Sequence, residues 1–230
     1  MQAHDPQERA QDRGPDPGGR PRPEQQHRRL SRRQQIIDAA LRVFASRGFE
    51  KATNRDIAQE AGIRSPGLIY HYFKDKADLF RQVAEERAPA LQLISRGDEL
   101  MDLPPREALT RFGMSFVKTF SDPMATAMFK MMLGEAIRRP MLAELFNSIG
   151  PGRGFALLTR YLEHQMDQGR LRRTHPGAAT RCFVGPLIAY VLTREVFVQP
   201  DSATLPPEIM VHTAVDTFLR GMEIRAPEQP

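Results

Sequence analysis

The sequence predicts an all-α protein, and three observations lead to this prediction. From Ser31 onward, apolar residues recur at spacings of three and four, the period of an amphipathic helix. Prolines and glycines separate these segments, as at Pro104-Pro105 and at 150–152. No stretch shows the strict alternation of apolar and polar residues that is typical of a half-buried strand.

The first segment, residues 1–29, is rich in proline, glycine, glutamine and arginine and lacks apolar periodicity. Such a segment buries too little surface to offset the entropy lost on ordering, so we expect a disordered tail. Arginines 28, 29, 32 and 33 at its end could contact a polyanion or could simply be solvated.

The first helix is expected to begin at Ser31. Ile37, Leu41 and Phe44 form its apolar stripe, and Gly48 occupies the place of a C-terminal cap.

A second helix is expected to begin after Thr53. The Thr53 hydroxyl can accept a hydrogen bond from the backbone of Asp56, and the Asp56 carboxylate can return to the helix start. Ile57 and Ala58 supply the buried side of this short helix.

A sharp turn and a third helix follow. Gly62 permits the left-handed backbone that ends a helix, and Ser65-Pro66 combines an N-cap residue with proline at the first helical position. The third helix should run from Pro66 to about Phe73. Two short helices joined by a turn containing glycine form a helix-turn-helix, here about 53–73.

The remaining helices are longer. Asp75 and Asp78 repeat the capping pattern and open a fourth helix, which Pro89 should kink or end. Further helices are expected at 106–120, 123–137, 141–147, 153–168, 177–198 and 207–222.

Charge is concentrated in one part of the chain. The formal net charge is +5, and residues 28–76 hold 11 lysines and arginines against 5 acidic residues, whereas the residues after 76 balance at 18 against 18. A localised basic surface is typical of a module that binds a polyanion. A merely solvated basic surface is the alternative.

Several function classes are disfavoured. The single cysteine, Cys182, excludes an internal disulfide, fits a reducing compartment, and is expected to be a small buried residue rather than a nucleophile. The longest uncharged apolar run, 182–192, is about half of what a membrane span requires, and the N-terminus lacks a secretion signal. Metal-binding spacing is absent from the sequence, and no cofactor is predicted. We therefore expect a cytoplasmic protein that is not an enzyme, with a helical membrane- or protein-binding module as the remaining alternative.

Residues 32–80 resemble the N-terminal domain of the tetracycline-repressor (TetR/AcrR) family. The resemblance rests on IIDAALRVFASRGF, T-x-x-D-I-A-x-x-A-G, L-x-Y-x-Y-F and KDKADLF. It implies a DNA-binding domain at 30–90 and a helical effector-binding and dimerisation domain at 91–230. The implied function is transcriptional regulation, by a repressor that leaves a palindromic operator when a small apolar or amphipathic ligand binds. Repression is the family default, and activation is the alternative. Double-stranded DNA is then the partner.

The resemblance implies that Tyr70, Tyr72 and Lys76 contact phosphates, although Tyr72 could simply pack. Thr53 and Arg55 are expected to contact the DNA backbone. Residues at the start of the third helix are the candidates for reading bases: Arg64, Ser65, Pro66, Gly67, Leu68 and His71. Arg64 lengthens the turn by one residue relative to many family members, and it could bind guanine or a phosphate.

The effector domain should hold a ligand among methionine and phenylalanine side chains, although plain core packing would produce the same pattern. The candidate pocket residues are Phe112, Phe116, Met128, Phe129, Met132, Phe155 and His164, with Arg138 as a second polar anchor. By resemblance, the last two helices pair with a second chain into a four-helix bundle. Their apolar stripes are Phe183, Leu187, Val191, Val211, Val215 and Leu219. A two-fold dimer would place its recognition helices about 34–36 Å apart on a palindrome.

Overall fold

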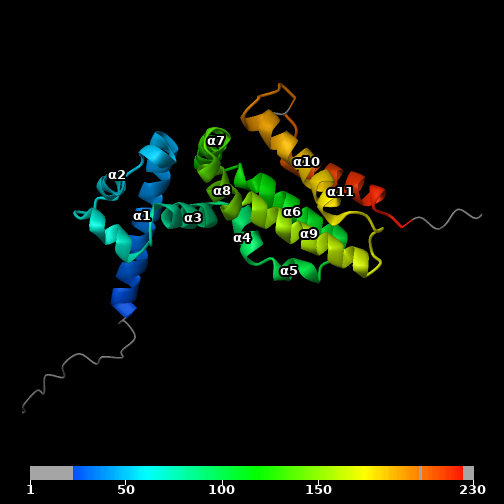
Figure 1. Ribbon diagram of the computed structural model, residues 1–230, viewed down its shortest axis with the longest axis horizontal. Helices are drawn as coiled ribbons and strands as arrows, with labels where there is room; N and C mark the ends of the chain where they lie inside the picture. Colours follow the sequence, from blue (N-terminus) through cyan, green and yellow to red (C-terminus); the bar gives the residue numbers. More distant parts are fainter. Residues whose placement is uncertain (1–22, 202–203, 225–230) are drawn as a thin grey trace, which may run out of the picture.

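A computed structural model describes residues 23–201 and 204–224, with side chains from residue 31. Every regular element in these ranges is a helix, which confirms the predicted fold class. Figure 1 shows α1 and α2 at one end of the molecule, α10 and α11 at the other, and α3 leading from one part to the other. The elements are α1 Pro23–Lys51, α2 Asn54–Glu60, the 3-10 helix η1 Pro66–His71, α3 Lys76–Arg87, α4 Pro89–Ser95, α5 Asp98–Met101, α6 Pro105–Thr119, α7 Pro123–Arg138, α8 Pro140–Ile149, α9 Pro151–Asp167, α10 Pro176–Glu195 and α11 Pro207–Gly221.

The first helix starts earlier than expected. Helix α1 reaches back to Pro23, so the predicted boundary of the tail at residue 29 is wrong, and only 1–22 of that tail lie outside the described residues. Gly48 breaks the helix with φ of +80°, as predicted, and one more turn follows to Lys51. Because glycine lacks a Cβ, it adopts this backbone conformation at little cost.

Proline begins most of the later helices. Pro89 occupies the first turn of α4 and thereby ends α3, as predicted, and α6 to α11 each begin with proline in the same way. Proline suits this position because the first helical N–H has no partner within the helix. The expected boundaries of α6 to α11 hold to within a few residues, whereas α4 and α5 were not predicted as separate helices.

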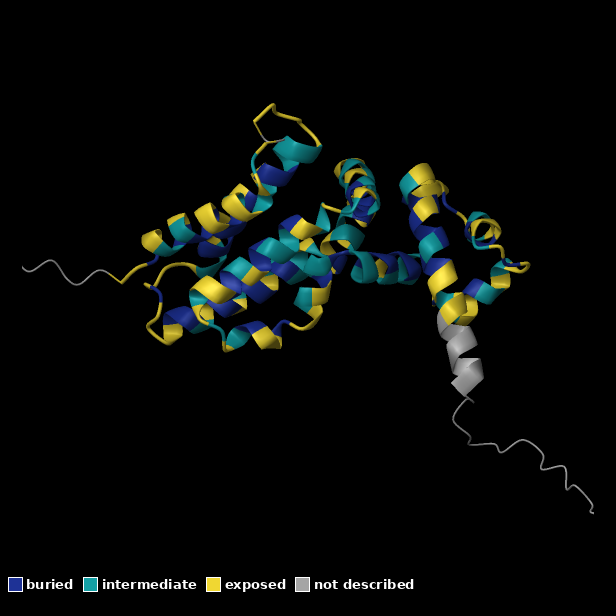
Figure 2. Ribbon diagram, turned by 180° about the vertical axis from the view of Figure 1, so that it is seen from behind, coloured by how far each residue is buried: buried dark blue, intermediate teal, exposed yellow. Residues whose placement is uncertain are grey.

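The buried side chains form two clusters. Figure 2 shows buried residues on the inner sides of the helices and exposed residues on their outer sides. The first cluster joins α1, α2, η1 and α3 to α7 and α8. The second cluster joins α6 and α9 to α10 and α11.

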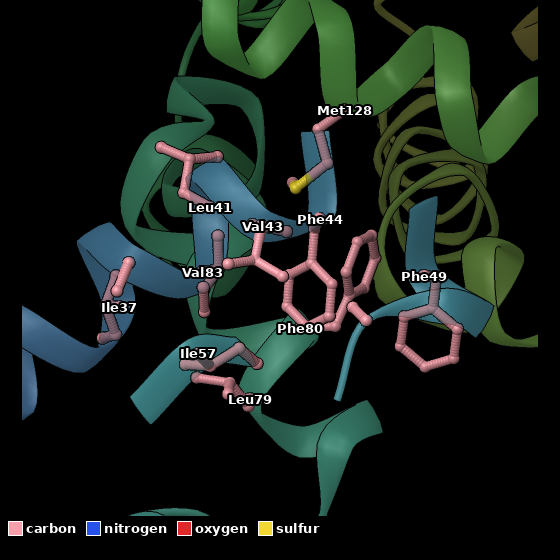
Figure 3. Packing of buried hydrophobic residues seen from close by; sticks show 14 of the residues in the cluster. Ile37, Leu41, Val43, Phe44, Phe49, Ile57, Leu79, Phe80, Val83 and Met128 are labelled. Carbon is pink, nitrogen blue, oxygen red and sulfur yellow. The ribbon is translucent and has the colours of Figure 1, made fainter. Parts of the chain in front are cut away.

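Aromatic rings form the centre of the first cluster. The Phe80 ring meets the rings of Phe44 and Phe49 edge-on, with both pairs of centroids 5.3 Å apart. Met128 reaches in from α7 toward Phe44 (Figure 3), and Met132, which is 1% exposed, belongs to the same cluster. Two helices of the C-terminal half therefore complete the core of the N-terminal half.

Ion pairs join the same elements. Arg139, directly after α7, lies 3.4 Å from the carboxylate of Glu50 in the last turn of α1. Arg153 on α9 lies 2.8 Å from Glu85 on α3. These contacts fix the orientation of the N-terminal helices relative to α7 and α9.

Candidate functional site

The start of α2 is fixed by reciprocal capping. The Thr53 hydroxyl accepts from the Asp56 backbone N–H at 3.1 Å, and the Asp56 carboxylate accepts from the Thr53 backbone N–H at 3.0 Å. The hydrogen bond from the Thr53 side chain holds the pKa of Asp56 below its usual value, and Arg47 adds to the effect at 2.6 Å. The predicted capping box is confirmed, and it leaves Arg55 exposed on the first turn of the helix.

The turn after α2 projects two predicted DNA-reading residues outward. Gly62 has φ of +64°, as predicted, and the Ile63 backbone N–H donates to the Ala58 carbonyl at 2.9 Å. The Ile63 side chain is buried, so the turn is anchored to the first cluster. Arg64 and Ser65 follow and are exposed.

The predicted third helix is a 3-10 helix rather than an α-helix, and it ends at His71. Ser65 precedes it as expected, but its side chain makes no capping hydrogen bond. Instead its backbone carbonyl accepts from the Leu68 N–H at 3.1 Å, the spacing of a 3-10 turn. The predicted side-chain cap at Ser65 is therefore wrong.

The two sides of η1 differ. Gly67, Tyr70 and His71 are exposed, and Tyr70 exposes 63% of its surface. Pro66, Leu68 and Tyr72 are half-buried; Leu68 and Tyr72 pack against the first cluster. The hydroxyl of Tyr70 is accessible to a phosphate, whereas Tyr72 at least partly fills the packing role that was its alternative.

Lys76 makes contacts within the chain that the sequence did not suggest. Its ammonium donates to the backbone carbonyls of Glu50 at 3.1 Å and Ala52 at 3.2 Å. It also lies over the Phe49 ring, 4.7 Å from the centroid. An ammonium has three donors, so Lys76 supports the end of α1 and retains one donor for a phosphate.

The ion pairs show which positive charges near the helix-turn-helix have a carboxylate partner and which do not. Arg42 and Arg47 pair with Glu60 and Asp56, each at 2.6 Å, and Arg33 pairs with Glu86. Among the described residues from 51 to 76, five lysines and arginines have no recorded acidic partner: Lys51, Arg55, Arg64, Lys74 and Lys76. They lie around α2, the turn and η1, so the uncompensated charge surrounds the helix-turn-helix.

The predicted ligand residues do not form one pocket. Met128 and Met132 pack in the N-terminal core, and Arg138 is exposed at the end of α7, so their role in ligand binding stays a prediction. Phe112 is buried in the second cluster, Phe155 lies under Arg181, and His164 is half-buried on α9. An apolar side chain at helical spacing indicates that it is buried, but it does not say against which neighbour.

Four half-buried phenylalanines form a ladder that includes two of the predicted residues. Phe116 and Phe120 lie 5.5 Å apart, Phe120 and Phe129 lie 4.9 Å apart, and Phe129 and Phe146 lie 6.0 Å apart, between ring centroids. This ladder crosses from α6 through α7 to α8.

A cavity of about 20 Å³ adjoins Phe120, which is room for roughly one water. Polar groups surround it: Arg194 donates to the Tyr190 hydroxyl at 2.6 Å, and Lys130 lies 3.3 Å from the Glu195 carboxylate. These residues were not predicted to lie together, because they come from the end of α6, from α7 and from α10, which are far apart in sequence. The Arg194-Glu195 pair at the end of an apolar helix was the available signal.

The predicted dimer residues point into their own chain. Five of them are at most 2% exposed and belong to the second cluster, so their assignment to an interface is wrong: Phe183, Leu187, Val191, Val211 and Val215. Leu219 is half-buried. Cys182 is exposed, which contradicts its expected burial, and it shares the exposed side of α10 with Gly185, Pro186 and Ala189.

Two features are absent from the residues that the structure describes. No three histidine, cysteine, aspartate or glutamate side chains lie close enough together to hold a metal ion. None of the helices described combines the length and the apolar character needed to cross a membrane.

Comparison with known families decides the identity of the fold. Residues 36–83 match the model of the bacterial regulatory proteins of the tetR family, and residues 107–221 match the C-terminal domain of AefR-like transcriptional repressors. The chain belongs to the tetR family. The two matched models describe bacterial regulatory proteins and transcriptional repressors, and the helix-turn-helix of this chain lies within the first match.

Individual relatives agree in the N-terminal part. An HTH-type transcriptional repressor of Mycobacterium tuberculosis is 39% identical over 71 residues, which are 31% of this chain and 37% of the relative. The match therefore spans little more than a third of that relative's length.

Solved structures agree along most of the chain. A tetR-family regulator from Mesorhizobium loti has a TM-score of 0.65 at 22% identity, over 86% of this chain and 99% of that chain. FadR from Bacillus subtilis, solved in complex with stearoyl-CoA, has a TM-score of 0.60 at 21% identity, over 83% and 99% of the two chains. At these identities the likeness establishes the fold.

Proposed function

We propose that this chain is a homodimeric repressor that binds a palindromic operator and leaves it when an apolar or amphipathic ligand binds the C-terminal domain. The observation that carries DNA binding is the surface formed by Thr53, Arg55, Arg64, Ser65 and Tyr70. These side chains are exposed on a capped helix-turn-helix, and the cations of this surface have no recorded acidic partner among the described residues. The repressors among the curated relatives support the sign of regulation.

The test of DNA binding is selection of genomic fragments on the full-length protein, followed by affinity measurements at several salt concentrations. Affinity should fall steeply with salt, because phosphate contacts release counterions. The Arg55→Ala variant should weaken binding to all sequences alike and reduce the salt slope by about one. Arg111→Ala, an exposed arginine on α6, is the matched control. Binding that neither prefers a sequence nor responds to salt would contradict the proposal.

Two alternative roles of Arg64, contact with a base and contact with a phosphate, predict different effects of its substitution. If its guanidinium binds guanine, Arg64→Ala should relax specificity at one position of each half-site, at about 1–3 kcal/mol. If it binds a phosphate, the loss should be the same for all sequences.

The dimer is proposed on the exposed side of α10. Cys182, Gly185 and Ala189 are small and exposed there, and Ile209 on α11 is 55% exposed. Small side chains permit two helices to approach closely, and a two-fold interface would bring the same residues of both chains together.

Sedimentation measures the oligomeric state. Ala189→Arg should shift the protein from dimer to monomer at micromolar concentration, whereas Ile137→Arg, at another exposed apolar residue, should not. A wild-type chain that sediments as a monomer would contradict the dimer and, with it, the palindromic operator.

A further inference from the structure

Helix α7 contacts the two halves of the molecule unequally. Its Met128 and Met132 side chains lie in the core around α1 and α3. Towards the second cluster, it reaches out through the Phe129 ring, 4.9 Å from Phe120 directly after α6, and through Lys130, paired with Glu195 on α10. The contacts between α7 and the α6–α10 pair are therefore made by side chains that a ligand could replace.

The aromatic ladder supplies an apolar surface at this junction. Phe116, Phe120, Phe129 and Phe146 are all half-buried, and the Phe120 and Phe129 planes lie at 81° to one another. Half-buried aromatic rings can pack against a hydrocarbon chain by dispersion and burial.

Two cations meet one carboxylate beside Phe120, an inner member of this ladder. Glu195 lies 3.3 Å from the Lys130 ammonium and 3.8 Å from the Arg194 guanidinium, and only 20% of its side chain is exposed. Tyr190 orients Arg194 by accepting its hydrogen bond. The Glu195 carboxylate thus occupies a place suited to an anionic head group, beside the cavity that Phe120 and Tyr190 line.

We propose that the effector is a hydrocarbon chain with an anionic head group, bound between α7 and the α6–α10 pair. The head group displaces Glu195 from Lys130 and Arg194, and the chain lies along the phenylalanine ladder. This inference rests on the proposed ligand response and names the class of ligand. Because Met128 and Met132 tie α7 to the N-terminal core, a ligand that moves α7 also moves the helix-turn-helix.

The test compares head groups on one chain length. The full-length protein is titrated calorimetrically with decanoate, decanol and decyltrimethylammonium below their micellar concentrations, and DNA affinity is followed in the same samples. Decanoate should bind and lower DNA affinity, decanol should bind more weakly, and the cation should not compete. Decanoyl-CoA in a further arm separates a phosphate-bearing conjugate from a free carboxylate as the source of the anion.

Three variants examine the site itself. Lys130→Gln and Arg194→Gln should each weaken decanoate binding by about tenfold to a hundredfold, the value of a charge-assisted hydrogen bond. Glu195→Gln should strengthen it, because the internal competitor loses its charge. Arg111→Gln is the matched control. Thermal melts show whether each variant is folded. If the Arg194 variant unfolds, the Lys130 variant still tests the head-group site, because the Lys130 side chain is 44% exposed and its substitution should not unfold the protein.

The outcomes separate this inference from the proposed function. Equal affinity for decanoate and decanol, or weaker decanoate binding in Glu195→Gln, would overturn the anionic head group while leaving DNA binding intact. Absence of operator binding without any ligand would instead contradict the proposed function.

Discussion

The two hydrophobic clusters are built alike but extend differently along the chain. Each is a set of helices around fully buried aromatic rings, Phe44 and Phe80 in the first and Tyr161 and Phe183 in the second. The second cluster uses mainly the C-terminal half of the chain. The first begins with α1 but ends with Leu142 and Ile149 on α8.

The N-terminal core therefore does not end at the domain boundary expected near residue 90, because residues of α7 and α8 also belong to it. Side chains of α7 and α8 pack in one cluster with those of α1, α2, η1 and α3, although these helices lie far apart in sequence. A conformational change at α7 can therefore act on α1 directly, through packed side chains that respond together.

The largest expected effect comes from truncating one ring in each core. Phe80→Ala and Phe183→Ala should each cost about 3–5 kcal/mol of unfolding free energy, because both rings are almost fully buried. Hydrogen exchange followed by mass spectrometry should show faster exchange in α1, α3, α7 and α8 for the first variant. For the second, it should show faster exchange in α6, α9, α10 and α11.

If Phe80→Ala made hydrogen exchange faster only in residues before about 90, the result would contradict a core shared with α7 and α8. If that variant does not fold, the smaller truncation Phe80→Leu should leave the same regional pattern.

A smaller effect distinguishes the two sides of α7. Met132→Ala should lose about 2–5 kcal/mol, because the side chain is 1% exposed in the first cluster. It should also lower DNA affinity by loosening α1. Phe129→Ala, at a half-buried position, should cost less stability in urea denaturation and leave affinity for DNA without ligand unchanged. Equal losses of DNA affinity in both variants would remove the distinction.

The local signals in the sequence predicted the DNA-binding half closely. The capping pair Thr53 and Asp56, the left-handed Gly62 and the helix break before Pro89 were predicted correctly, because each depends on neighbours within four residues. The role of Lys76 was missed, since its carbonyl partners lie more than twenty residues away.

In the C-terminal half, the helices were predicted but their partners were not. The apolar stripes of α10 and α11 were assigned to an interface with a second chain, because periodicity cannot tell an intramolecular neighbour from a second chain. Phe183 and Val215 in fact pack in the core of their own chain. The exposed side of α10 carries small residues, which do not form an apolar stripe in the sequence.

Alanine substitution at two glycines should change the stability in opposite directions, each by about 1 kcal/mol. Gly62→Ala should destabilise by about 1–2 kcal/mol, because φ of +64° is strained for a residue with a Cβ even though nothing lies within 4 Å. Gly134→Ala, inside α7 and equally unobstructed, should stabilise by about 0.5–1 kcal/mol through helix propensity. Thermal denaturation of both variants measures the difference, and a destabilised Gly134→Ala would indicate a close approach to α7 that the structure lacks.

The smallest effect is a pH dependence that differs between the two regions. The pKa of Asp56 is lowered by its hydrogen bonds with Thr53, and that of Asp216 by its hydrogen bond from Arg106. A carboxylate with a lowered pKa stabilises the folded state above the unfolded pKa of about 4, and this stabilisation is lost as the pH falls through the folded value.

Asp56→Asn and Asp216→Asn should therefore differ from wild type in melting temperature at pH 7, and the difference should shrink as the pH falls from about 4 through the lowered pKa of each carboxyl. Only Asp56→Asn should also weaken DNA binding, because Asp56 fixes the start of α2 beside Arg55 whereas Asp216 lies on α11. A difference from wild type that grows as the pH falls would reverse the sign of the argument. Loss of DNA affinity in Asp216→Asn would show instead that the second cluster also positions the helix-turn-helix.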